Sequence, residues 1–410
     1  MTGGATTVAF TPSEFQKLWA GQTVSLLGTA LTNFALPTLA VLVLHATPPQ
    51  VGAIAALETL PFPVLGMLVG VIADRYSRRH IMIAADWVRF VVLASVPVAA
   101  FLGVLKLPQL YAVALVSGTA SAFFGITYQS YLPVLVPAEQ LAGANAKLEF
   151  SNSASQMAGS ALAGGFVQWI GAAGAIAIDA ASYLVSVASL GLIRTREPKH
   201  DGPPLSLRQG FREIGEGLRF VLHASDLRWI AAATATTNLG GSMVNAVILI
   251  YAYRILHLKP GLLGLAFGLA ELGFVGALFS TKVRRRFGLR ASLAVALLGA
   301  AFGTAALLLG QLAWPYLVMF GGYAIVTIAT PIYNINQISY RQALTSVSMQ
   351  GRVNATMRTF VWATLPLGAL AGGYLGAVIG IPATIAVGAA ICSLAALWLV
   401  SFRERAELLE

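Results

Sequence analysis

Long apolar runs, separated by short stretches rich in charged residues, Pro and Gly, dominate this sequence. A membrane-spanning helix needs about 20 mostly apolar residues to cross the hydrocarbon core of a bilayer. An even number of such runs places both termini on the same side of the membrane. The sequence predicts an all-α integral membrane protein with twelve transmembrane helices, near residues 18–44, 50–73, 80–104, 108–132, 142–169, 172–193, 227–255, 261–283, 289–311, 314–342, 350–380 and 381–402.

The scarcity of charge excludes a soluble protein. Charged residues make up 10% of the chain and hydrophobic residues 57%, whereas soluble domains average about 25% charged residues. The single cysteine, Cys392, excludes an intrachain disulfide, and the five His residues show no metal-ligand spacing. There is no Walker A loop for a nucleotide and no Ser/His/Asp arrangement typical of hydrolases. We therefore expect no enzyme activity, no cofactor and no metal.

The distribution of Lys and Arg predicts the orientation, because cytoplasmic loops of membrane proteins carry the excess of both residues. With cytoplasmic termini, the external loops hold only Lys106, Arg254 and Lys259 of the 26 Lys and Arg residues. This asymmetry predicts a multi-pass protein of the bacterial cytoplasmic (inner) membrane with both termini in the cytoplasm. It also explains the net charge of +10 without nucleic acid as a partner.

The only long polar stretch, residues 194–226, divides the chain into two halves, 1–193 and 227–410. Beyond Pro204 the apolar residues of this connector recur with a spacing near 3.6, which predicts an amphipathic helix on the cytoplasmic surface. The two halves therefore form the predicted domains, each with six transmembrane helices.

The halves also share short sequences. Residues 161–166 read Ala-Leu-Ala-Gly-Gly-Phe, and residues 369–374 read Ala-Leu-Ala-Gly-Gly-Tyr. Both hexapeptides fall in the fifth helix of their half, which indicates two pseudo-symmetric six-helix bundles. The glycines of these stretches are candidates for close helix contacts: Gly159, Gly164, Gly165, Gly368, Gly372 and Gly373.

A charged loop between the second and third helices carries the strongest local motif, Gly-Val-Ile-Ala-Asp-Arg-Tyr-Ser-Arg-Arg at residues 70–79. It resembles the signature loop of the major facilitator superfamily, with Ser77 where the family usually has a second Gly. The resemblance implies the fold of these transporters, with a substrate site between the bundles. It also implies a cytoplasmic gate in which Asp74 attracts the N-terminus of the eleventh helix. The gating residues are Gly70, Asp74, Arg75, Arg78 and Arg79; the alternative is a positive-inside loop with an incidental Asp.

Further segments resemble the 12-helix drug-exporter group that includes macrolide efflux proteins and the enterobactin exporter. They are residues 18–28, the Asp-Trp-Val-Arg sequence at 86–89, residues 131–141 and Asn145-Ala146. Ser160 stands where family exporters tend to have Pro, and Thr29 where the group often has an acidic residue. The resemblance implies export of small molecules and does not identify the substrate.

Ionisable side chains inside the membrane are costly, and each is a candidate functional residue. Asp86 and Arg89 lie three residues apart on one helical face, where they are expected to neutralise each other, although Asp86 stays a candidate for proton coupling. Asp179 is expected near the external end of its helix, facing water or capping the helix.

Glu58 and Glu271 have apolar neighbours and no basic residue within a helical turn. A lone buried carboxylate suits reversible protonation, so both are proton-coupling candidates, with Glu149 as a weaker one. The alternative is that each carboxylate pairs with a guanidinium from another helix, Arg89 or Arg358.

Polar side chains in the first, fourth, seventh and tenth helices are candidates for lining a substrate cavity. The alternative is hydrogen bonding between helices, which small polar groups commonly provide in membranes. The candidates are Asn33, Tyr128, Gln129, Asn238, Met243, Asn245, Tyr333, Asn334, Asn336 and Gln337.

The leading hypothesis is a secondary active transporter that acts as a monomer and exports amphipathic, drug-like or siderophore-like molecules in exchange for protons. An importer or facilitator of the same fold is the first alternative. A non-transporting receptor or assembly factor is the second, and the lack of a sizeable extramembrane domain argues against it.

Overall fold

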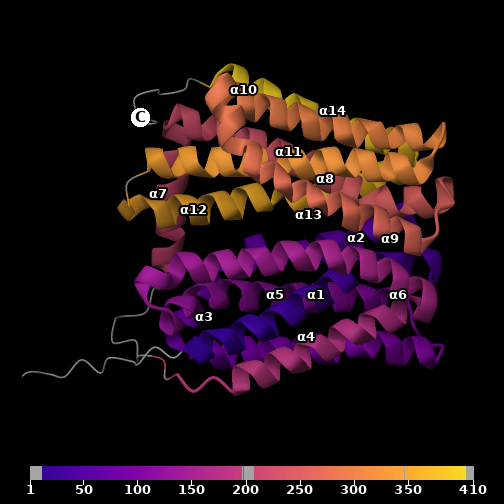
Figure 1. Ribbon diagram of the computed structural model, residues 1–410, viewed down its shortest axis with the longest axis horizontal. Coiled ribbons are helices and arrows are strands. Elements are labelled where there is room, and N and C mark those ends of the chain that lie inside the picture. The colour runs from indigo at the N-terminus through magenta and orange to yellow at the C-terminus, as the bar shows by residue number, and fades with distance from the viewer. Residues whose placement is uncertain (1–11, 196, 198–206, 346, 403–410) are drawn as a thin grey trace, which may run out of the picture.

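The computed structural model describes residues 12–195, 197, 207–345 and 347–402, and the described part of the chain contains helices and no strands. The principal helices are α1 Pro12–Leu42, α2 Pro48–Thr59, α3 Pro61–Arg75, α4 Arg78–Phe101, α5 Leu107–Leu135, α6 Leu141–Gly191, α7 Leu207–His223, α8 Ser225–Ile250, α9 Pro260–Ala270, α10 Gly276–Ala306, α11 Pro315–Leu344, α12 Val347–Trp362, α13 Thr364–Val378 and α14 Ile381–Leu394 (Figure 1). Short 3-10 or π segments are η1 Ala138–Gln140, η2 Tyr251–Ile255, η3 Glu271–Val275, η4 Leu307–Gln311 and η5 Ala395–Val400.

Helix α6 crosses the molecule twice. Its first arm runs parallel to α1, since Ser151 bonds to Trp19 and Ser155 to Thr23. Its second arm runs antiparallel, since Ser182 approaches Gly28 whereas the later Ser189 bonds to the backbone of the earlier Lys17. The reversal lies at Gly171, whose φ of 78° and ψ of 164° are essentially restricted to glycine.

A second reversal occurs in α10 at Gly288, with φ 77° and ψ 167°. In contrast, α2 and α3 are too short to cross a bilayer separately, at 12 and 15 residues, and form one crossing that is interrupted at Pro61. Nine segments of the described chain are long and apolar enough to span a membrane. Two of these reverse direction, and the α2–α3 pair adds one more crossing. This accounts for the twelve predicted crossings.

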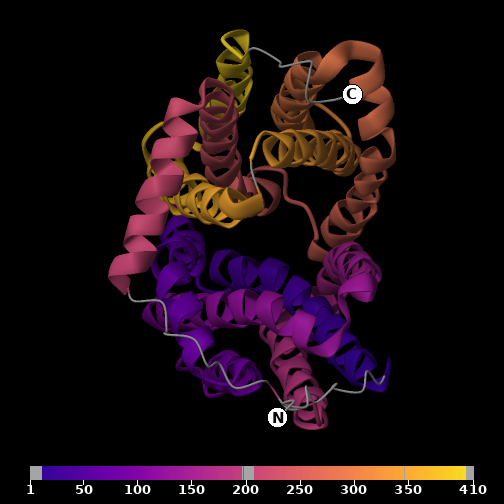
Figure 2. The same cartoon turned by 90° about the vertical axis from the view of Figure 1, so that its left-hand side faces the viewer.

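Two groups of helices lie side by side, α1–α6 and α8–α14 (Figure 1). Helix α7, within the predicted connector, lies across one end of both groups and contacts α3, α8 and α12 (Figures 1 and 2). We call this end of the molecule the α7 end and the opposite end the far end.

The hydrophobic core differs between the two ends. At the α7 end each group has its own core, one around Leu18 and Met82 and the other around Leu293 and Tyr340. At the far end a single core joins both groups, and it includes Leu39, Ile176, Val247 and Leu263 among its members. The two groups therefore share one core at the far end and have separate cores at the α7 end.

Candidate functional site

Glycines bring the two groups into backbone contact at the far end, along α2 and α13. A methyl group at Gly52 would lie 2.5 Å from the carbonyl oxygen of Ala369 and 3.0 Å from the Cα of Gly373. Since real Cβ atoms do not approach other atoms so closely, only glycine allows this contact. Gly372 and Gly368, on the same helix, instead face the backbone of α8.

A second glycine contact closes the other side of the far end, between α6 and α9. A methyl group at Gly164 would lie 2.8 Å from the Cα of Gly264. Beside it, the backbone N–H of Gly261 donates to Gln168 Oε1 at 3.1 Å. Gly159 faces Ala30 of α1, and no described residue lies within 4 Å of a methyl group placed on Gly165.

Polar and aromatic contacts seal the far end between these two glycine contacts. The hydroxyl groups of Thr38 and Tyr253 lie 3.0 Å apart and are buried. The Arg254 guanidinium donates to the Val41 carbonyl at 3.1 Å. The rings of Phe34 and Phe267 meet edge to face, with centroids 6.4 Å apart. The far end is therefore closed by interlocking contacts from both groups of helices.

The gating motif lies at the α7 end, where the two groups have separate cores. Among the described residues, nothing lies within 4 Å of a methyl group placed on Gly70, so none of them packs against that glycine in this state. Arg75 is exposed. The side chains of Asp74 and Arg358 lie outside the described residues.

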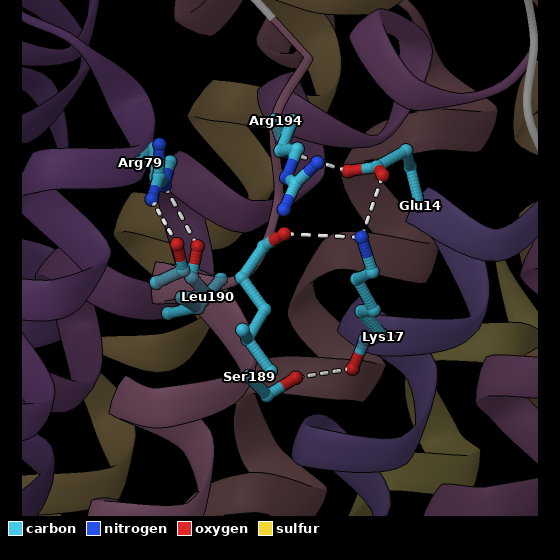
Figure 3. Close-up of polar contacts among 8 residues, drawn as sticks. Glu14, Lys17, Arg79, Ser189, Leu190 and Arg194 are labelled. Atoms are coloured by element: carbon cyan, nitrogen blue, oxygen red, sulfur yellow. Dashed lines mark hydrogen bonds and ion pairs between the residues drawn. The ribbon is translucent and has the colours of Figure 1, made fainter.

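The rest of the motif is bound to its own group of helices. Glu197 caps the N-terminus of α4, because its carboxylate accepts from Ser77 Oγ at 2.6 Å and from the backbone N–H groups of Arg78 and Arg79 at 2.8 and 2.9 Å. The Arg79 guanidinium donates to the carbonyl groups of Leu190 and Gly191 at the end of α6, at 2.7 and 2.5 Å (Figure 3). The motif thus joins the ends of α4 and α6 to the start of the connector.

A neighbouring network ties α1 to the same place (Figure 3). Glu14 pairs with Lys17 at 2.6 Å and accepts from the Arg194 backbone N–H at 2.7 Å. Lys17 also donates to the Leu192 carbonyl at 3.0 Å, and Ser189 donates to the Lys17 carbonyl. The sequence did not indicate the contacts with Ser189, Leu192 and Arg194, because these residues lie more than 170 positions from their partners in α1.

A buried charge cluster lies between α1, α4 and α6. Asp86 and Arg89 form the expected ion pair, and the Arg89 guanidinium carbon lies 4.6 Å and 4.3 Å from the ring centroids of Phe124 and Tyr183. Asp179, which we expected to face water or cap its helix, is instead fully buried. It accepts from Ser182 Oγ at 3.2 Å and packs against Gly28 at the middle of α1. That expectation was wrong because Asp179 lies eight residues beyond the reversal at Gly171, two turns inside the bundle.

The other acidic candidates lie in different surroundings. Glu58 and Glu271 are half-buried, at the end of α2 and at the start of η3, and neither forms an ion pair with a described residue. Glu149 is exposed near the start of α6. In the described residues no three His, Cys, Asp or Glu side chains are grouped as metal ligands.

The cavity candidates divide by exposure. Asn33, Gln129, Asn245 and Asn334 are exposed, whereas Met243, Tyr333, Asn336 and Gln337 are buried. Several of the less exposed polar groups bond within their own group of helices: Tyr333 with Thr234 at 2.7 Å, Asn336 with the Ile332 carbonyl at 2.8 Å, and Asn238 with the Val361 carbonyl at 3.3 Å. Tyr128 stacks on Phe124.

Comparison with known proteins assigns the chain to a family. Residues 18–365 match the model of the Major Facilitator Superfamily. The chain belongs to this superfamily. It is a membrane transporter and not an enzyme, with the twelve-helix fold of major facilitator transporters.

Proteins named as efflux pumps or transporters resemble the chain over half of its length or more. It is 28% identical over 357 residues to the "Multidrug efflux pump Tap" of Mycobacterium tuberculosis. This match covers 82% of this chain and 80% of that protein. It is 28% identical over 211 residues to "Macrolide efflux protein A" of Streptococcus pyogenes, about half of each chain. The crystal structure of a bacterial homologue of the iron transporter ferroportin superposes with a TM-score of 0.76 at 17% identity, covering 96% of this chain and 99% of the other.

Proposed function

We propose that this transporter exports amphipathic small molecules, drug-like or siderophore-like, from the bacterial cytoplasm by proton-coupled alternating access. Residues 1–193 and 227–410 act as two bundles that rock about a site between them, within a single copy of the chain in the inner membrane. The observation that carries the proposal is the contrast between the single core that joins both bundles at the far end and the separate cores at the α7 end.

The basic residues support the direction of access. Arg75, Arg79 and Arg285 lie at the α7 end, whereas Lys106 and Lys259 lie in loops at the far end. By the positive-inside rule the α7 end faces the cytoplasm. A transporter closed at the far end and separated at the cytoplasmic end is in the state that an exporter uses to load its substrate.

An apolar groove supports the substrate class. It has a volume of about 550 Å³ and lies where α2 meets α3 and α12 meets α13, and its lining includes Leu57, Leu60, Val64, Phe360 and Leu367. Several of these side chains are exposed, Val64 by 64% and Leu367 by 59%. In a bilayer they contact lipid tails, so an amphipathic molecule dissolved in the membrane can enter between the bundles with its apolar part still covered.

The exposed amides support the position of the cavity. Asn33 and Asn245 lie within membrane-spanning helices and are exposed. Polar groups at this depth usually face the bundle interior or a water-filled cavity, where they can orient the polar part of a substrate.

Closure of the cytoplasmic end would rely on Asp74, whose charge attracts the N-terminus of α12 with about 0.3–1 kcal/mol. Asp74→Asn should therefore raise the accessibility of the α7 end to thiol reagents. Unchanged accessibility together with unchanged transport would remove Asp74 from the gate.

The function can be tested by drug susceptibility. A strain that overexpresses the protein should tolerate higher concentrations of at least one member of a panel of macrolides, tetracyclines and ethidium than a deletion strain. Accumulation of that compound should rise when a protonophore is added, and Glu58→Gln or Glu271→Gln should weaken its efflux. Greater accumulation in the overexpressing strain would indicate the importer alternative, and no difference across the panel would contradict the proposed substrate class.

A further inference from the structure

Asp86, Arg89 and Asp179 form one buried unit, which we call the charge triad. Asp86 and Asp179 have no exposed surface and Arg89 is 5% exposed. Arg89 is held by its ion pair with Asp86 and by the rings of Phe124 and Tyr183 on the neighbouring helices. Because three groups fix the guanidinium, its charge cannot move away when the charge of its neighbours changes.

The charges of the triad do not balance. Two carboxylates share one guanidinium, and one oxygen of each carboxylate, Asp86 Oδ2 and Asp179 Oδ2, has no hydrogen-bond partner among the described residues. A buried anion without a counter-charge is strongly disfavoured and takes up a proton instead. Since Asp86 has the ion pair with Arg89, Asp179 is the group left to carry the proton.

We propose that the charge triad is the proton-binding unit of the N-terminal bundle, with Asp179 as the carboxylate that takes up and releases the exchangeable proton. This inference rests on the proposed proton-coupled transport and adds its site. When Asp179 releases its proton, the carboxylic acid dissociates to a carboxylate and a proton, and the reverse reaction restores the neutral acid.

The neighbours of Asp179 link its protonation to α1 and α2. The α1 helix presents the hydroxyl groups of Thr29, which bonds to Tyr183 at 2.9 Å, and of Thr32. The α2 helix presents Glu58, which is close enough to Asp179 for their negative charges to repel each other. Because α2 also forms the far-end contact through Gly52, loss of the Asp179 proton while Glu58 is ionised adds repulsion on a helix that must move when the far end opens.

Infrared spectroscopy of the protein in liposomes, titrated with pH, tests the proposal through the carbonyl stretch of buried protonated carboxylic acids. Asp179→Asn should abolish one titrating band. Asp86→Asn should abolish the same band, since Arg89 then neutralises Asp179 without a proton. Arg89→Gln should add a second band, since two buried carboxylates then lack a counter-charge. Glu139→Gln, which changes an exposed carboxylate in η1, should leave the spectrum unchanged.

Retention of the wild-type band in either Asp179→Asn or Asp86→Asn would overturn the proposal. The two variants are independent, so if one fails to fold the other still decides the question. No transported substrate is needed for this measurement. Failure of the proposed export would instead appear in wild-type susceptibility, which is scored separately from the infrared bands.

Discussion

At the scale of single residues, the far end is closed by glycines whose neighbours leave no room for a side chain. Gly164→Val would place a Cβ 2.8 Å from the Cα of Gly264. Overpacking of this kind costs about 1–3 kcal/mol, which shifts a two-state equilibrium roughly 5- to 150-fold. The state closed at the far end should therefore lose population. Labelling of a cysteine at Thr38 with an impermeant thiol reagent from the far end should become faster.

The neighbouring glycine provides a matched control. Gly165→Val makes the same change one position along α6, where nothing in the described part of the chain lies within 4 Å of the added Cβ. It should label at the wild-type rate. Equal labelling of both variants would mean that the Gly164 contact does not hold the far end closed.

The burial of Asp179 is a feature that the sequence alone did not predict. A long apolar run identified the helix around Asp179, but the face on which Asp179 lies depends on the reversal at Gly171 and on packing against Gly28. Small residues surround Asp179 in the sequence, and Ser182 and Tyr183 follow it within one helical turn. This combination is the signal that indicates a tightly packed interior position.

At the scale of elements, the start of α4 depends on a residue of the connector. Both carboxylate oxygens of Glu197 accept hydrogen bonds from the Ser77 to Arg79 segment. Glu197→Gln leaves one acceptor oxygen and removes the charge that favours a helix N-terminus. We expect a loss of about 0.5–2 kcal/mol of stability, seen as a Tm lowered by a few degrees in detergent.

The same charge removal at an exposed site serves as the comparison. Glu139→Gln should leave the Tm unchanged, because Glu139 is exposed in η1. If both variants have the Tm of the wild type, Glu197 does not stabilise the start of α4. The motif at 70–79 was evident from the sequence, whereas this cap was not, since the local sequence contains no sign of a partner more than 110 residues away.

At the scale of the whole molecule, the count of twelve crossings was predictable because hydrophobic length alone fixes it. Which end of the molecule is closed could not be predicted from the sequence, because the same helices can close either end.

The orientation in the membrane follows from the placement of Lys and Arg. It can be measured with single cysteines in a Cys392→Ser background, since Cys392 is the only native cysteine. An impermeant thiol reagent added outside intact cells should label Leu312→Cys in the far-end loop and leave Tyr76→Cys unlabelled.

Labelling of Tyr76→Cys alone would show that the α7 end faces outward. The molecule would then be open to the outside, and the proposed cytoplasmic loading of the substrate would be wrong. Both positions are exposed, Leu312 by 82% and Tyr76 by 66%, so differences in burial do not explain a failure to label. Permeabilised cells, in which both cysteines should react, confirm that each variant is present.

The most direct test of alternating access is a pair of distances measured by spin labels in the reconstituted protein. One pair, Tyr76 and Arg285, spans the two bundles at the α7 end, and the other, Leu102 and Leu312, spans them at the far end. We predict that a change of pH shortens one distance and lengthens the other in the same molecules, and that Asp179→Asn removes this response. Two distances that stay fixed, or that change in the same direction, would contradict the account.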